Sequence, residues 1–285
     1  MPSREGTPRG AAQLDFNGKG LDSTDGKVLA ELLKDNQTAQ VLNVFSNGLD
    51  ADTGKLFLPI VDKPHFEVFS GIPIKQIREN SVTELDLKGS KGKQLEACGG
   101  IILAHVLAGN NSVRVLNVFG NAIGQAGGEA MAEALKTNKT LEEIHVGNLM
   151  VGCRVRLRSS GEEKVVTIID GGGDIQVQGG SGDVKPGTFD VIPAILPAKQ
   201  LRENTIETLN LSNKGLDVDG GLMLAALMAG NSSTQYLNVF GNKIPEDVLR
   251  AIMNSKESIR TFGNAEKLDF SGKGLDSTDA KVLAD

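Results

Sequence analysis

The sequence predicts an α/β repeat protein that carries a small all-β insertion, and three observations lead to this prediction. The letters "LNVFGN" at 116–121 return at 237–242, and a near copy, "LNVFSN", stands at 42–47. Short strand-like segments of similar sequence, called strand lines below, recur at a fixed spacing along the chain. One stretch, 151–194, fits none of these lines and alternates apolar with polar residues. Repetition at a fixed step is typical of strand–helix units that stack on their neighbours to bury their apolar faces.

The step between neighbouring lines fixes the size of one unit. It is 28 residues from Leu14 to Leu42, from Leu116 to Ile144 and from Leu209 to Leu237. Between the lines lie helical patterns at 23–36, 124–138 and 217–231. The first of them opens with a Ser/Thr cap and places four apolar residues on one predicted face, namely Val28, Leu29, Leu32 and Leu33. Each unit is therefore expected to hold one strand and one long helix.

The strand lines share the pattern L-x-x-L-x-L-x-x-N-x-L, with substitutions. This pattern resembles the leucine-rich repeat, and the step of 28 resembles its ribonuclease-inhibitor-like class, the kind found in NOD-like receptors. The resemblance implies a curved solenoid with a parallel sheet inside and helices outside. The ninth position holds Asn47, Asn121 and Asn242, where an amide can bond the backbone of its own turn and the next.

The lines are grouped in threes, and the second triad contains extra chain. Phe69 and Leu85 are 16 residues apart, whereas Ile144 and Leu209 are 65 apart. The extra chain predicts strands at 153–158, 163–170, 174–178 and 189–194, split by glycine-rich turns. Their order resembles a small SH3-like barrel. The predicted organisation is an N-terminal tail at 1–12, repeats at 13–148, the insertion at 149–195 and further repeats at 196–285.

An SH3-like barrel can bind proline-rich peptide or, in Tudor relatives, methylated lysine, and both uses need several aromatic side chains. The insertion has only Phe189, which we expect to fill the core of the barrel. The pattern therefore favours a module that decorates the repeats over one that reads a peptide.

The phenylalanine inside the recurring letters is the candidate contact residue. Strand alternation turns the third, fifth and seventh pattern positions away from the core. Two interpretations stay open for the seventh position: apolar anchors for a partner, or side chains that shield the turn between strand and helix. His145 also takes an outward strand position and is a further candidate contact. The predicted partner-binding residues are Phe45, Phe119 and Phe240 at the seventh position, Asn43, Asn117 and Asn238 at the fifth, and His145.

Catalytic, cofactor and metal sites are not predicted. The Gly-Lys pairs at 18–19 and 272–273 are followed by Gly, where a phosphate loop needs Ser or Thr. His65, His105 and His145 are not paired with Cys or carboxylate at ligand spacing, and no Ser–His–Asp order stands out. Cys98 and His105 share one predicted helix, seven residues apart, which is a poor geometry for a nucleophile pair.

Charge and cysteine content limit the classes of partner and the cellular compartment that we expect. The net charge of -6 argues against nucleic acid and anionic membrane as partners. Two widely spaced cysteines fit a reducing, cytoplasmic location. No run of 18 apolar residues is present, and the first residues do not read as a signal peptide.

The predicted function is a non-enzymatic scaffold for protein–protein interaction. Proteins that share the resemblance include inhibitors and GTPase activators, so a regulatory role of that kind is one alternative. The other is a structural repeat segment of a larger assembly. Residues 14–31 and 268–285 match at 15 of 18 positions, which favours a piece of a longer array. Uncapped edge strands could also pair end to end.

Overall fold

The computed structural model describes residues 12–90, 92–151, 153–170, 174–180, 182–239 and 241–254. The chain forms two compact units, Met1–Arg114 with Asn121–Thr140 (unit 1) and Val115–Gly120 with Leu141–Asp285 (unit 2). The predicted tail up to residue 11, the contact residue Phe240 and the repeat copy at 268–285 lie outside the described residues.

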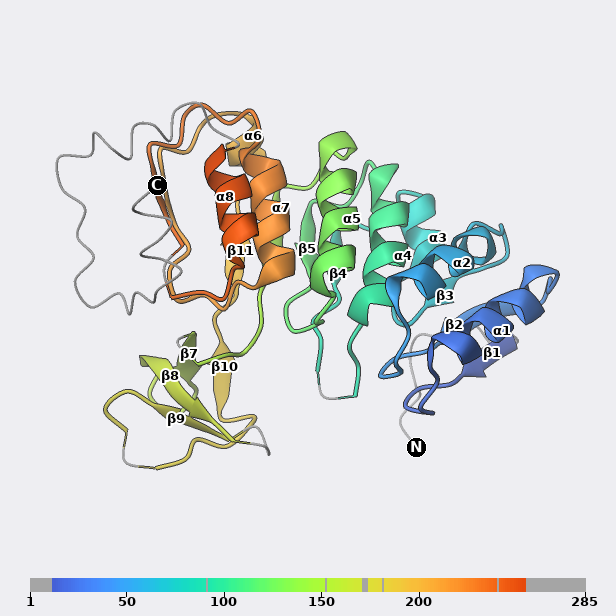
Figure 1. Cartoon of the computed structure of the whole chain (residues 1–285), viewed down its shortest axis with the longest axis horizontal. Helices are drawn as coiled ribbons and strands as arrows, with labels where there is room; N and C mark the ends of the chain where they lie inside the picture. The colour runs from blue at the N-terminus through green and yellow to red at the C-terminus, as the bar shows by residue number, and fades with distance from the viewer. Residues whose placement is uncertain are drawn as a thin grey trace. The chain divides into compact units, whose positions relative to one another are not determined.

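Unit 1 alternates strands and helices. Its β1, β2 and β3 pair side by side in a parallel sheet, with Leu14 opposite Leu42 and Leu42 opposite Phe69. Helices α4 and α5 run side by side (Figure 1). Its elements are β1 (Ala12–Asp15), α1 (Ser23–Lys34), β2 (Ala39–Asn43), α2 (Ala51–Val61), β3 (Val68–Phe69), α3 (Ile74–Arg78), β4 (Glu84–Asp86), α4 (Glu96–Ala108) and α5 (Gly124–Thr137).

Unit 2 contains the insertion and the last repeats. Helices α7 and α8 lie side by side, as Figure 1 shows. Strands β12 and β13 pair in parallel, with Leu209 opposite Leu237. Its elements are β5 (Val115–Asn117), β6 (Glu143–Val146), β7 (Arg154–Leu157), β8 (Glu163–Ile169), β9 (Ile175–Val177), β10 (Phe189–Val191), β11 (Ala194–Leu196), α6 (Ala198–Arg202), β12 (Thr208–Asn210), α7 (Val218–Met228), β13 (Tyr236–Asn238) and α8 (Glu246–Asn254).

The predicted curved solenoid is wrong. The strands fall into several small sheets, some parallel and some antiparallel, instead of one continuous parallel sheet. Residues 194–196 explain part of the break. The chain returns from the insertion as β11, which pairs antiparallel with β6 and puts Leu196 opposite Ile144. A parallel repeat strand can no longer add at that edge of β6.

The predicted SH3-like barrel is also wrong, because the insertion does not close. Its strands form an open antiparallel sheet in the order β10-β7-β8-β9, and the outer strands β9 and β10 do not pair with each other in the described part of the chain. The four strands themselves lie where the alternating pattern predicts them. The prediction that Phe189 fills the core is confirmed: it packs with Val155, Val166 and Ile175 in the buried cluster of the insertion.

The repeated asparagines join neighbouring repeats. The Asn47 amide nitrogen donates to Val44 O in its own turn at 2.9 Å and to Phe16 O in the preceding repeat at 2.9 Å. Its side-chain oxygen accepts from the backbone N–H of Leu21 at 3.0 Å. Asn242 makes the equivalent bonds to Val239, Leu211 and Leu216. The bonding to the own turn is confirmed, but the second partner is the preceding turn rather than the next.

Glycines allow the repeat helices to approach closely. A Cβ added to Gly100 of α4 would lie 3.0 Å from Cβ of Ile123 and 3.1 Å from Cα of Gly127 in α5. A Cβ added to Gly221 of α7 would lie 2.8 Å from Ile244 Cγ2. Both glycines stand at the same place in their repeats, so the two helix pairs share one packing plan.

A second set of asparagines, which the sequence pattern did not reveal, ends the helices. Asn110 follows α4, and its amide nitrogen donates to Ile77 O of the short helix α3 at 2.7 Å. Asn231 follows α7 and donates to Leu201 O of the short helix α6 at 2.7 Å. Both amides are buried. They fasten the end of each helix to the short helix that precedes it.

Candidate functional site

Three side chains form a row across the outward face of the strands of unit 2. His145 of β6 lies opposite Asn117 of β5 and opposite Ile195 of β11. In β6 the neighbours Ile144 and Val146 point inward and are buried, so alternation places His145 on the other face. We call Asn117, His145 and Ile195 the His145 row.

The imidazole of His145 is enclosed but incompletely bonded. The exposed fraction of its side chain is 24%. Its Nε2 is buried and makes no hydrogen bond within the described residues, and the nearest ionic partner is Glu143 Oε2 at 3.6 Å. A ring nitrogen withdrawn from water without a hydrogen bond carries a desolvation cost. A polar group of a partner could remove that cost.

The flanking residues supply two other kinds of contact. Ile195 is 43% exposed and gives the row a large apolar side chain open to solvent. Asn117 is half-buried, and its Oδ1 accepts a hydrogen bond from the backbone N–H of Phe119 at 3.1 Å. The row therefore offers an apolar side chain, an imidazole and an amide side by side.

The predicted phenylalanine anchors do not share this exposure. Phe119 is only 4% exposed, so the prediction that it stands out from the surface is wrong. Phe45 is half-buried, and a Cβ added to Gly71 would lie 3.2 Å from its ring. These placements fit the alternative in which the phenylalanine shields the turn. A role of the phenylalanines in partner binding stays a prediction.

The remaining predicted contact residues are engaged within the chain. Asn43 donates to Asp15 Oδ1 at 3.0 Å and accepts from the backbone N–H of Phe45 at 3.2 Å. Asn238 is 2% exposed, far less than a contact residue needs. Two of the predicted residues, His145 and Asn117, lie opposite each other in neighbouring strands.

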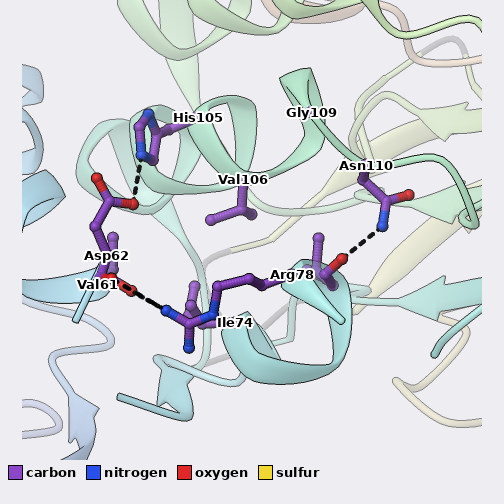
Figure 2. Close-up of a pocket in the computed structure, with 9 residues that line it drawn as sticks. Val61, Asp62, Ile74, Arg78, His105, Val106, Gly109 and Asn110 are labelled. Atoms are coloured by element: carbon purple, nitrogen blue, oxygen red, sulfur yellow. Dashed lines mark hydrogen bonds and ion pairs between the residues drawn. The ribbon is translucent and has the colours of Figure 1, made fainter. Parts of the chain in front are cut away.

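A pocket in unit 1 brings together polar side chains that lie far apart in the sequence. His105 Nε2 lies 2.8 Å from Asp62 Oδ1, as Figure 2 shows. Sequence spacing gave no sign of this pair, because 43 residues separate its members. The pocket is lined by Val61, Asp62, Ile74, Ile77, Arg78, His105, Val106, Gly109 and Asn110.

The other polar groups of this pocket already have structural tasks. Arg78 donates to the carbonyl oxygens of Lys63 at 3.0 Å and Phe66 at 2.8 Å, just beyond the end of α2. The Asn110 amide nitrogen donates to Ile77 O. Among the described residues, no Ser, Thr or Cys lines this pocket. The His–Asp pair therefore has no nucleophile beside it to activate.

Neither cysteine is poised as a nucleophile. Burial, followed by the carboxylates of Asp50 and Glu96, raises the pKa of the Cys98 thiol to about 12. Burial also raises the pKa of the Cys153 thiol. Both are free and buried. A thiol with a raised pKa stays protonated near neutral pH, and the thiolate is the reactive form.

Searches for other kinds of site give negative findings for the described residues. Within 12–254, apart from the gaps named above, no three His, Cys, Asp or Glu side chains gather closely enough to hold a metal ion. In the same part of the chain, the helices are too short or too polar to cross a membrane.

No protein-family model matches this chain, and no curated protein matches it. Ile195 is the member of the row that sequence reasoning missed, because its position depends on the return of β11 beside β6. No sequence signal marks this position, because residues 194–196 are all apolar, and the exposure of Ile195 between two buried neighbours is seen only in the structure.

Proposed function

We propose that this chain is a non-enzymatic protein-binding scaffold whose contact surface includes the His145 row. The observation that carries the proposal is the meeting of exposed Ile195 with the unbonded, buried Nε2 of His145 on one sheet face. Contact surfaces of proteins combine an apolar anchor with polar groups that become bonded in the complex. The partner is a protein segment that places an apolar side chain over Ile195 and a polar group beside His145.

The proposal includes a resemblance to leucine-rich repeats within a single repeat unit, which consists of a strand, a turn with an asparagine and a helix. The bonds of Asn47 and Asn242 support it there. A reducing, cytoplasmic setting also belongs to the proposal. It is supported by two free cysteines, both of them buried.

The test compares two surface isoleucines of unit 2. Ile195→Glu and His145→Ala change the row, whereas Ile168→Glu changes an equally exposed position of the insertion, at 50%. The three variants and the wild type would carry a photo-crosslinker at Asn117, and crosslinked partners would be quantified by mass spectrometry. We expect Ile195→Glu to lower the yield of each specific adduct at least tenfold and His145→Ala to lower it less. Ile168→Glu should leave it unchanged.

An unchanged adduct pattern with Ile195→Glu would contradict the proposal. Equal losses in all three variants would also contradict it, because they would point to a general effect of surface charge.

A further inference from the structure

Helix α1 exposes an apolar face that its equivalent α7 buries. The helices α1, α4 and α7 belong to the first repeat of each triad and align through Asn36, Asn110 and Asn231. Val28 and Leu32 of α1 are 56% and 72% exposed. At the same positions α7 carries Met223 and Leu227, which are 0% and 2% exposed.

The short helix before each repeat accounts for the difference. In unit 1, Ile74 and Ile77 of α3 line the same pocket as Val106 of α4, the equivalent of Leu32. In unit 2, α6 packs on α7 in the same way. The described residues contain no such short helix before α1. Val28 and Leu32 of α1 therefore stay uncovered by any short helix of the described residues.

Asn36 differs from its equivalents Asn110 and Asn231 in the same sense. The amide nitrogens of Asn110 and Asn231 donate to Ile77 O and Leu201 O of the preceding short helices. The side-chain oxygen of Asn36 accepts from the backbone N–H groups of Thr38 and Ala39. Its amide nitrogen has no acceptor in the described part of the chain. Two apolar side chains and one amide donor thus lack the same partner.

The sequence supplies a matching element near its other end. Both short helices end in an Ile–Arg or Leu–Arg pair, and the arginine, Arg78 or Arg202, stands seven residues before the leucine that opens the next strand line. Ile259 and Arg260 form the same pair, eight residues before Leu268. Thr261 and Phe262 replace the Glu and Asn that follow the other two pairs, so the match covers the Ile–Arg pair and its spacing.

The repeat that follows this pair is nearly identical to the one that contains α1. Residues 268–285 and 14–31 match at 15 of 18 positions. Any surface that accepts residues 268–285 is therefore chemically suited to residues 14–31 of another copy. Two molecules can exchange equivalent elements at little cost, because the contacts are the same within and between chains.

We infer that the exposed face of α1 is a docking surface for a second copy of this chain, whose residues around Ile259–Arg260 cover Val28 and Leu32. We call the exposed face of α1 the head and the residues around Ile259–Arg260 the tail. The contact is heterologous, because the head of one copy meets the tail of another. A pair of copies therefore keeps one free head and one free tail, to which further copies can bind. This surface is distinct from the His145 row, so the inference does not depend on the proposed function.

The test uses full-length chains and sedimentation velocity over a range of concentrations. The head variant is Val28→Glu with Leu32→Glu, and the tail variant is Ile259→Glu. The control is Leu56→Glu, which alters an apolar residue of α2 that is 46% exposed. We expect the average mass of the wild type and of the control to rise with concentration. Each of the other two variants alone should keep the mass of one chain.

The decisive sample is an equimolar mixture of the head and tail variants. Each pair can then form one intact contact, so the mass should rise to that of two chains and stop there. A wild type that stays at one chain at every concentration overturns the inference. A tail variant that associates like the wild type overturns it as well, because α1 would then pair with α1. A mixture that remains at one chain has the same consequence.

Discussion

Helices α1 and α7 occupy the same place in their repeats, yet they differ in what covers them. Positions 195 residues apart correspond, so Gly26 aligns with Gly221 and Leu32 with Leu227. The glycine side of both helices is buried against the following helix. The opposite side is buried in α7 and exposed in α1. The sequence pattern therefore determines that a helix forms, whereas the elements packed against the helix determine which of its apolar side chains are buried.

The largest expected effect separates the two equivalent leucines. Leu227→Ala removes a buried side chain and should lower the free energy of unfolding by about 2–5 kcal/mol. Leu32→Ala removes an exposed one and should change it by less than about 0.5 kcal/mol. Urea unfolding at low protein concentration measures both. Similar losses for the two variants would mean that α1 is covered within one chain.

The next effect concerns what α1 and α7 share. Asn47 bonds the turn before α1, and Asn242 bonds the turn before α7, through equivalent backbone groups. Each Asn→Ala variant leaves backbone donors and acceptors without partners and should cost about 1–3 kcal/mol. Because three bonds of each asparagine are equivalent, the two costs should be similar in unfolding experiments. A decrease in the free energy of unfolding for only one of the two variants would contradict the equivalent role of the two asparagines.

The smallest effect lies at the start of the helices. Asp22 caps α1: it accepts from the backbone N–H groups of Asp25 and Thr24, which lower the pKa of its carboxyl group. Asp217, the equivalent in α7, makes no capping hydrogen bond with its side chain. A lowered pKa in the folded state gives stability that is present above the unfolded pKa of about 3.9 and is lost as the pH falls through the folded value.

Asp22→Asn keeps a capping side chain but removes the titration. The difference in melting temperature between the wild type and Asp22→Asn should therefore be constant near neutral pH and shrink below about pH 4. Thermal unfolding followed by circular dichroism across this range is the measurement. A difference that grows toward low pH would contradict the assigned sign.

Local elements could be predicted from the sequence, and their assembly could not. The helical patterns at 23–36, 124–138 and 217–231 correspond to α1, α5 and α7, and the alternating stretches of the insertion correspond to β7–β10. The pattern placed Val28, Leu29, Leu32 and Leu33 on one apolar face, but Leu33 is buried and Leu32 is exposed. Periodicity records which residues are apolar and contains nothing about the neighbour that would cover them.

The candidate site shows the same limit. His145 could be identified because strand alternation alone turns it outward. Ile195 could not, since it joins the row only through the antiparallel pairing of β11 with β6. Phe119 was expected to be exposed because alternation was carried past the end of β5 at Asn117. Beyond the strand the period of two no longer applies, and the side chain is buried.

Hydrogen–deuterium exchange at low and high protein concentration tests most directly whether the open face of α1 is an interface. If a second copy covers Val28 and Leu32, amides of Ser23–Lys34 should exchange more slowly as concentration rises. Those of Val218–Met228, whose equivalent face is already covered, should exchange at the same rate. Exchange in α1 that does not depend on concentration would contradict the account.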